Sequence, residues 1–430
     1  MRFFSALVGC AVTSVALALH AGPASQPLPA FPGAEGFGAL ATGGRGGEIF
    51  HVTSLEDSGP GSFREAVSRP RRIIVFDVGG VVRLKSNIAG SSDLTILGQT
   101  APGEGIGLYG RSVSFSGHTN VIVRYLRMRE GINGDKGKCS LNLTDSAKMI
   151  FDHDSIQWGR WDCLGLTHGS HDITFQYCML GQGVDPQRFG ALVDSVLNIT
   201  FSHNLWIDNQ SRNPKAKGTI QYINNVVYNW GGNGLVGGHS AADHQLDAIG
   251  NYFIKGPSSS GRFASEFTST DKVFQKDNYA DLDRDGRLNG QLVTESGFGE
   301  SAAAPTFVNA PFLHPPILVT IDPAAVAWQK AVEGAGCSLH RDAVDLRLIA
   351  EVSSLGSAGQ IVKSEAEAGG MGEIAGGPLP ASTVHDGIPD SWKTAHGLDP
   401  KDPKVVGADY NHDGYLNVEK YANELAAKKP

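Results

Sequence analysis

The middle of the chain carries a short apolar pattern that recurs about every 25 residues. Each copy reads apolar, any residue, apolar, and a polar or turn residue follows five positions after its first member. Apolar positions with a period of two predict a β-strand, and no helical pattern connects the copies. The first members are Leu94, Val121, Met149, Ile173, Ile199, Ile220, Leu246 and Val273, at spacings of 27, 28, 24, 26, 21, 26 and 27 residues.

Strands that repeat at this interval without helical connections are typical of a β-solenoid. We predict an all-β chain folded as a right-handed, single-stranded parallel β-helix, in which equivalent side chains of successive coils stack. Leucine-rich repeats and propeller blades are the alternatives, but the leucine pattern is absent and a blade needs about 40 residues. Side chains five positions into each copy should form a column, along which asparagines can hydrogen-bond. They are Gln99, Leu126, Asp154, Cys178, Asn204, Asn225, Asn251 and Asn278.

The sequence on either side of the repeat predicts how the chain is divided. Residues 72–77 are apolar and predict the first coil, and helical spacing over 342–352 predicts a helix that covers the β-helix. A basic residue, an apolar run and then small residues at the start are typical of an export signal. The predicted segments are the signal over 1–24, the β-helix over 25–352, a flexible Gly/Ala/Ser-rich linker over 353–385 and a small C-terminal segment over 386–430.

Composition and charge narrow the possible functions. The 430 residues carry a net charge of −8, which argues against a nucleic-acid-binding surface. After the apolar run at the start, no stretch approaches the roughly 20 apolar residues of a membrane span. We therefore expect a secreted, extracellular monomer with no membrane or nucleic-acid partner.

Cysteines and glycosylation sequons leave two questions open. No two of the later cysteines form a CxxC pair of the kind that binds zinc. An oxidising compartment permits disulfides, so buried thiols and a single bridge are both compatible with the sequence. The sequons would carry glycans only in a eukaryotic source. The cysteines are Cys139, Cys163, Cys178 and Cys337, and the sequons begin at Asn142, Asn198 and Asn209.

Residues 211–218 concentrate positive charge in this acidic chain. Arg212, Lys215 and Lys217 fall within six residues, between two strand patterns. Pro214 restricts the backbone there, so the charges should be held in a fixed arrangement. We expect this stretch to bind a polyanion at one local site.

Six short motifs follow one another along about residues 30–350. They are Phe31–Gly38, Gly43–Gly47, Asp57–Arg64, Gly98–Gly103, Phe151–His153 and Arg212–Pro214. Together they resemble the motifs of bacterial and fungal pectate lyases and pectin lyases, of the type of polysaccharide lyase family 1. The resemblance implies a parallel β-helix enzyme that cleaves a uronic-acid polymer by β-elimination, with an acidic polysaccharide as its partner.

The resemblance also implies roles for the basic residues. β-Elimination removes the C5 proton of a uronate, which needs positive charge to stabilise the enolate that develops. Arg212 matches the family's catalytic arginine, and neighbouring cations would help it to act as a base with an alkaline optimum. Arg188 matches a second family cation, and Lys217 stands where the family carries another arginine, with a weaker grip on carboxylates. The alternative for Arg212 is a surface pair with Asp208, and Lys215 is predicted to be solvated surface.

The family's calcium ligands in the catalytic cleft are mostly missing. Residues 137–139 lack the acidic cluster that the resemblance implies, and Asp162 is the remaining candidate ligand, with Asp135 and Asp145 as nearby possibilities. Arg160, between Trp158 and Trp161, is similar to the fixed arginine and aromatic residues of pectin lyases, which act without calcium. Arg160 would then bind a carboxylate while the tryptophans stack on sugars. The alternative is that the tryptophans fill the coil and Arg160 pairs with Asp162.

Two other stretches resemble calcium-binding loops. Residues 409–420 match an EF-hand or dockerin-like loop, except that Lys420 occupies the position of the bidentate glutamate, so Glu419 would have to serve instead. Structural calcium is predicted there. Residues 281–289 repeat the opening of the loop without a terminal acid, and a solvated turn is the alternative. The candidate ligands are Asp409, Asn411, Asp413, Asn417 and Glu419 in the first loop, and Asp281, Asp283 and Asp285 in the second.

Two further functions stay open on this fold. A glycoside hydrolase would need a close pair of carboxylates, with Asp152, Asp154 and Asp162 as candidates. A non-catalytic polysaccharide-binding protein would also suit the C-terminal segment. Asp152 and His153 are predicted to be a structural hydrogen-bonded pair, with His153 stacked on neighbouring coils.

Overall fold

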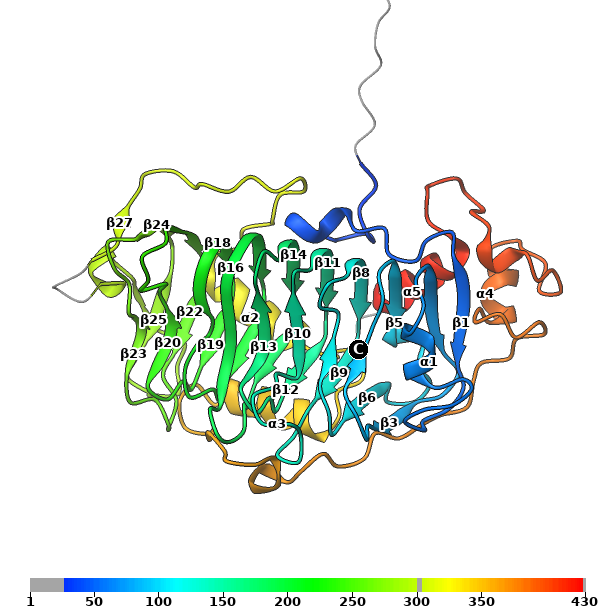
Figure 1. The fold of residues 1–430 in the computed structure, drawn as a ribbon, viewed down its shortest axis with the longest axis horizontal. Coiled ribbons are helices and arrows are strands. Elements are labelled where there is room, and N and C mark those ends of the chain that lie inside the picture. The colour runs from blue at the N-terminus through cyan, green and yellow to red at the C-terminus, as the bar shows by residue number, and fades with distance from the viewer. Residues whose placement is uncertain (1–26, 300–303, 428–430) are drawn as a thin grey trace, which may run out of the picture.

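The computed structural model describes residues 27–299 and 304–427, so the predicted export signal over 1–24 lies outside the described residues. The chain winds into a right-handed parallel β-helix whose axis follows the long direction of the molecule (Figure 1). Each coil contributes up to three short strands, and equivalent strands of successive coils pair in parallel to form three ladders. The predicted fold class is confirmed.

The strands of the three ladders are as follows. The first ladder runs through β1 (Glu48–Val52), β2 (Arg72–Phe76), β5 (Leu94–Leu97), β8 (Thr119–Arg124), β11 (Ala147–Asp152), β14 (His171–Gln176), β16 (Phe189–Ser202), β18 (Lys215–Ile223), β21 (His244–Ile249), β24 (Asp271–Lys276) and β27 (Thr306–Phe307). The second runs through β3 (Gly80–Arg83), β6 (Ile106–Tyr109), β9 (Leu126–Arg129), β12 (Ser155–Gln157), β15 (Met179–Gly181), β17 (Leu205–Ile207), β19 (Val226–Tyr228), β22 (Tyr252–Ile254) and β25 (Tyr279–Asp281), with β26 (Gln291–Leu292) added antiparallel. The third contains β4 (Ile88–Ala89), β7 (Val113–Ser114), β10 (Leu141–Thr144), β13 (Asp162–Thr167), β20 (Asn233–Val236) and β23 (Arg262–Ser265).

Strands β16 and β18 join the third ladder to the first. Strand β16 spans 14 residues, pairs with β13 through its first half and pairs with β14 through its second half. In β18 the backbone turns this corner at Gly218, whose φ is +154°. A Cβ at this position would lie 2.3 Å from the carbonyl oxygen of Val196, so the corner requires glycine.

The repeat in the sequence corresponds to the first ladder, residue by residue. Leu94 pairs with Val121, Val121 with Met149, and the same register continues through all eight first members to Val273. The predicted first coil over 72–77 contains β2, which is the second strand of this ladder, because β1 pairs ahead of it. The residues of β1 are mostly half-buried, so this strand carries a weaker apolar signal in the sequence.

The predicted column of asparagines is also present. The Nδ2 of Asn204 donates to the Oδ1 of Asn225 at 2.9 Å, Asn225 donates to Asn251 at 3.2 Å, and Asn251 to Asn278 at 2.8 Å. All four side chains are fully buried. Each amide therefore satisfies its neighbour in an interior where an unpaired amide would be costly.

Helices and the segment after them cover the second ladder. Helices α2 (Ala324–Gly334) and α3 (Ala343–Ser353) pack there, and α3 confirms the predicted covering helix. The composition of residues 353–385 predicts a flexible linker, but this segment packs along the β-helix (Figure 1), with Val362, Met371 and Ile374 buried. The prediction of flexibility is wrong because these apolar side chains find a surface to cover. The segment boundaries themselves stay predictions.

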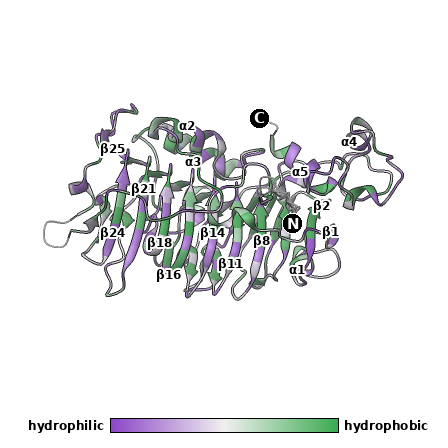
Figure 2. Cartoon of the chain, turned by 90° about the horizontal axis from the view of Figure 1, so that it is seen from above, coloured by the Kyte–Doolittle hydropathy of each residue, from purple (hydrophilic) through white to green (hydrophobic). Residues whose placement is uncertain are grey.

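The C-terminal segment packs against early strands of the first ladder. Helix α5 (Asn417–Ala427) lies beside β2 (Figure 2), and Ile388 and Trp392 join Ile73 and Val75 in one apolar cluster. Every helix in the described part of the chain is too short or too polar to span a bilayer. The remaining helices are α1 (Phe63–Val67), α4 (Asp390–Ala395), and the 3-10 turns η1 (Phe37–Leu40), η2 (Gly98–Thr100), η3 (Glu295–Gly297), η4 (Glu365–Ala368) and η5 (Val405–Gly407).

Candidate active site

Three loops on adjacent coils bring the predicted site residues together. Loops 158–161, 182–188 and 208–214 lead into β13, β16 and β18, which are neighbours in the third ladder. The chain is aligned where it approaches these strands, because Asp162 pairs with Phe189 and Phe189 forms a bridge with Ser211, four residues before β18 begins. Residues that are about 25 positions apart in the sequence are therefore direct neighbours in space.

Arg212 is held in a fixed orientation at this alignment. Its Nη1 lies 3.2 Å and 3.3 Å from the two carboxylate oxygens of Asp162. Its guanidinium carbon lies 4.3 Å from the centroid of the Phe189 ring, which is a favourable cation–π distance. The side chain is 21% exposed, so part of the guanidinium faces solvent while the rest is packed. Arg212 does not form the surface pair with Asp208, which is fully buried.

Asp162 is a buried carboxyl group that faces this arginine. Its side chain has no exposed surface. Burial raises its pKa to about 6, although Arg212 and, more weakly, Lys215 favour the ionised form. The carboxylate is thus stabilised by the basic residues around it and by little else.

Three more cations lie on the loop beside Arg212 and on the strand that follows it. Lys217 donates to Asp194 at 3.0 Å, and the Nε of Arg188 lies 3.2 Å from Asp185. Lys215 has its Nζ 3.1 Å from the Nε2 of a histidine, and burial followed by the charge of Arg212 lowers its pKa. Lys215 is thus half-buried within the group, which corrects the prediction of a solvated surface residue. We call Arg188, Arg212, Lys215 and Lys217 the basic cluster.

The structure buries one of the two tryptophans of loop 158–161 and exposes the other. Trp158 is fully buried and donates its Nε1 hydrogen to Gln182 at 3.1 Å, so the prediction that it stacks on a sugar is wrong. It is the first residue after β12, with a φ of +63°, and this turn directs the ring into the packed layer. Trp161 is 37% exposed and remains available for stacking.

Arg160 holds two loops together. Its Nε donates to the carbonyl oxygen of Asp185 at 3.2 Å, and its Nη1 donates to that of Gly134 at 2.9 Å. The alternative pair with Asp162 is not formed, and the binding of a substrate carboxylate by Arg160 stays a prediction. Arg160 instead connects loop 182–188 to the loop between β9 and β10.

The structure adds residues that the motifs did not single out. Phe189 supports Arg212, and Glu266 lies 2.9 Å from the Nδ1 of His239, which in turn contacts Lys215. Glu130 is fully buried beneath Arg160, accepts its backbone hydrogen at 3.1 Å, and has a pKa raised by burial to about 7. None of these lies in a local motif, so only the stacking of coils reveals them.

A calcium ion does not fit among the residues around Arg212. Both oxygens of Asp162 face the guanidinium, and Cys139 occupies a position where the family resemblance implies an acid. Among residues 27–299 and 304–427, no group of three or more His, Cys, Asp or Glu side chains is arranged to hold a metal ion. In the 281–289 loop, Asp283 and Asp285 accept hydrogen bonds from their own loop backbone, and calcium there stays a prediction.

The carboxylates proposed for a hydrolase are not assembled into a pair. Asp152 is fully buried and lies 2.8 Å from Arg124 and 2.9 Å from His153, which confirms the predicted structural pair. Asp154 is buried too and accepts the backbone hydrogen of Leu126 at 2.8 Å. The ring of His153 stacks between two tyrosines of adjacent coils.

The four later cysteines are buried free thiols, so the single bridge is not formed.

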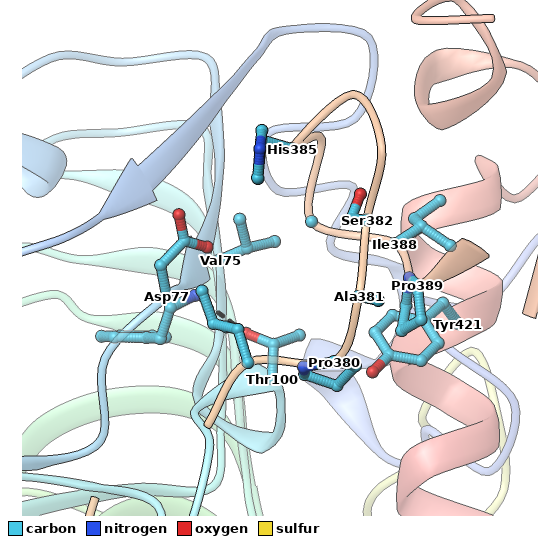
Figure 3. Close-up of a pocket in the computed structure, with 13 residues that line it drawn as sticks. Val75, Asp77, Thr100, Pro380, Ala381, Ser382, His385, Ile388, Pro389 and Tyr421 are labelled. Atoms are coloured by element: carbon cyan, nitrogen blue, oxygen red, sulfur yellow. Dashed lines mark hydrogen bonds between the residues drawn. The ribbon is translucent and has the colours of Figure 1, made fainter. Parts of the chain in front are cut away.

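A separate pocket of about 220 Å³ lies between the β-helix and the C-terminal segment (Figure 3). Asp77 and Thr100 project from one side, and His385 and Tyr421 from the other. Its lining includes no residue of the basic cluster. The pocket is therefore a feature of segment packing and not of the candidate active site.

Comparison with known proteins assigns the chain to a class. It is 44% identical over 405 residues to the "Probable pectate lyase C" of Aspergillus terreus, covering 93% of this chain and 94% of that protein. It is 43% identical over 403 residues to the protein of the same name from Emericella nidulans, covering 93% of both chains. A scan against models of protein families gives no match.

Solved structures share the fold. A pectate lyase bound to a hexasaccharide matches with a TM-score of 0.53 at 14% identity, covering 73% of this chain and 98% of that one. The cedar pollen allergen jun a 1 matches with a TM-score of 0.54 at 18% identity, covering 70% and 92%. The β-helix and the similarity to the curated relatives define a polysaccharide lyase. The chain belongs to the pectate lyase family.

Proposed function

We propose that this chain is a secreted lyase that cleaves a polyuronate of the pectate or pectin type by β-elimination, with Arg212 as the proton-abstracting base. The observation that carries the proposal is the placement of Arg212, which is fixed by Asp162 and Phe189 and has the rest of the basic cluster on the neighbouring loop and strand. The family membership supports a uronate polymer as the substrate.

Binding begins with the carboxylates of the polymer. Arg188 and Lys217 each form a partly exposed ion pair, which contributes only about 0 to 1 kcal/mol, and Lys215 contacts a histidine. A substrate carboxylate can therefore replace the present partners of these basic residues. Trp161, at the rim of loop 158–161, offers an apolar face for a sugar ring.

The reaction then needs a base and stabilisation of the developing enolate. The partly exposed side chain of Arg212, in its neutral guanidine form, would take the C5 proton and become a guanidinium, beside the cations Arg188, Lys215 and Lys217. The same cations stabilise negative charge as it spreads from C5 onto the uronate carboxylate. Elimination then breaks the bond from C4 to the glycosidic oxygen, which leaves with a proton from solvent or a nearby group.

No step is assigned to calcium, because the carboxylate of Asp162 is already paired with Arg212. Secretion and a monomeric state remain part of the proposal. Of the three sequons, Asn209 is fully buried and bonded to Asn213 at 2.9 Å, so glycans could be attached to the folded chain only at Asn142 and Asn198.

The test is the ultraviolet absorbance of the unsaturated product, measured on polygalacturonate and methylated pectin with and without a chelator. Arg212→Ala should lower the rate at least about 100-fold, as expected for loss of a general base. Arg287→Ala, an exposed arginine on the 281–289 loop, is the matched control and should keep full activity. Reducing ends formed without absorbance, or activity that survives Arg212→Ala, would contradict the proposal.

A further inference from the structure

The loop over residues 409–420 has the backbone plan of a calcium loop, but a side chain occupies its centre. In an EF-hand loop, positions 1, 3, 5, 7, 9 and 12 surround the ion, and position 7 contributes its backbone carbonyl. Position 12 of this loop is Lys420, in the first turns of α5. Its side chain is 7% exposed and is directed back into the loop.

The ammonium group of Lys420 contacts the atoms that would otherwise bind calcium. It donates to the carbonyl oxygen of Tyr415 at 2.8 Å, lies 3.1 Å from the Oδ1 of Asp413, and contacts the Oδ1 of Asp409. These are positions 7, 5 and 1. A lysine ammonium has three hydrogens to donate, so its capacity is used completely. The ring of Tyr410 lies 4.8 Å away and adds a cation–π contact.

The other predicted ligands are turned to different partners. Glu419 lies 3.0 Å from Arg45 and accepts the backbone hydrogen of Leu416 at 2.9 Å. Asn417 is fully buried and donates to the carbonyl oxygen of Val405 at 2.7 Å. Glu419 therefore cannot replace the missing bidentate glutamate, which corrects the prediction that it would.

The exchange preserves charge. A glutamate at position 12 together with Ca²⁺ would add a net charge of about +1 to the loop, since the ion carries two positive charges and the carboxylate one negative charge. Lys420 adds the same +1 by itself.

We propose that Lys420 is a built-in cation that takes the place of calcium in this loop, so that the C-terminal segment folds and covers the β-helix without a metal ion. The loop keeps the carboxylates and the glycine turn of a calcium site, while position 12 supplies the positive charge. Where the proposed substrate applies, this has a use, since polyuronates bind calcium and could not remove a lysine. The advantage in the presence of polyuronates rests on the proposed function, whereas the proposed role of Lys420 does not.

The test is hydrogen exchange of residues 405–427 in the full-length protein, with calcium and with a chelator. Three variants are compared with the original chain. Lys420→Met removes the charge, Lys420→Glu restores the usual position 12, and Lys401→Glu is an exposed control with the same charge change. Because the readout is local, calcium bound anywhere else does not affect it.

In the original chain and in Lys401→Glu, residues 405–427 should exchange hydrogen at the same rate in calcium as in chelator. Lys420→Met should exchange at least about tenfold faster in both, because two carboxylates are left unpaired. Lys420→Glu should exchange faster in chelator and return to slow exchange in calcium. The proposal is overturned if calcium slows exchange in the original chain, or if Lys420→Met exchanges as slowly as the original in chelator. Since neither outcome involves catalysis, failure here is distinct from failure of the proposed function.

Discussion

The guanidinium of Arg212 lies 3.2 Å from the carboxylate of Asp162, whose side chain has no exposed surface. The two residues are 50 positions apart and meet only because their coils stack. The pair fixes the direction of Arg212 and places its one close negative charge on the buried side. The other side of the guanidinium is left to solvent and to the substrate we propose.

The protonation of Asp162 should be visible in the pH dependence of stability. The pKa of Asp162 is about 6 in the folded protein against 3.8 for the free group. Between about pH 4 and 6, the carboxyl group is therefore protonated in the folded state and ionised in the unfolded chain. This contribution favours folding at low pH and is lost as the pH rises through about 6. Asp162→Asn should therefore gain stability over the original chain by up to about 3 kcal/mol at neutral pH, and by far less near pH 4.

Urea unfolding at several pH values measures this difference. Asp283→Asn, an exposed aspartate on the 281–289 loop, is the control and should show no such dependence. A difference between Asp162→Asn and the original chain that is constant over this pH range would contradict the assignment.

Lys217→Arg should strengthen substrate binding. An arginine presents two parallel N–H groups to a carboxylate where lysine presents a single charge, so the KM should fall about 2- to 10-fold while kcat stays nearly constant. Lys217 is paired with Asp194 at 3.0 Å, a contact that arginine can also make. Initial rates over a range of polygalacturonate concentrations test this, with Lys272→Arg on β24 as the control. An unchanged or higher KM would count against Lys217 as a substrate contact.

Arg160→Gln should act through the loops and not through direct binding. Both of its bonded nitrogens face backbone carbonyl oxygens, at Gly134 and Asp185, so their loss should speed hydrogen exchange in both loops. We expect kcat to fall about tenfold with a smaller change in KM, because the cations lose their alignment. Lys136→Gln, exposed on the same loop, is the control. A large rise in KM without faster exchange would indicate that Arg160 binds substrate directly.

Asn225→Ala should destabilise the β-helix by about 3 kcal/mol. The amide accepts from Asn204 and donates to Phe201 and Asn251, all inside the coil, so its removal takes a buried hydrogen bond from each of these groups. Urea unfolding gives the free energy of unfolding, with the exposed Gln291→Ala as the control. A loss below about 1 kcal/mol would show that the column adds little to stability.

The fold was predictable where one physical rule repeats. Each apolar position that faces the interior must match its neighbours above and below, so the period in the sequence is the register of the ladder. The same holds for Asn204 to Asn278, since a buried amide has its best partner in an identical amide one coil away. Strand β1 lacks this signal because it is only half-buried.

The site was predictable in part. Arg212, Arg188 and Lys217 were predicted from the family resemblance, and the structure places them on adjacent coils, while their roles stay proposals. The orientation of Trp158 was not predictable, because one left-handed turn after β12 sends the ring inward and nothing local distinguishes it from Trp161. The packing of residues 353–385 escaped prediction for a similar reason, since composition describes an isolated chain and not the surface it meets.

The position of the C-terminal segment also determines when the fold can be completed. Arg45 is paired with Glu419, 374 residues later, and Ile73 is covered by Ile388 and Trp392. At a synthesis rate of about 5 to 20 residues per second, the ribosome needs roughly 20 to 75 s to reach that partner. During this time the earliest coils present an uncovered apolar face to chaperones. A truncated product would keep that face permanently, which marks it for quality control.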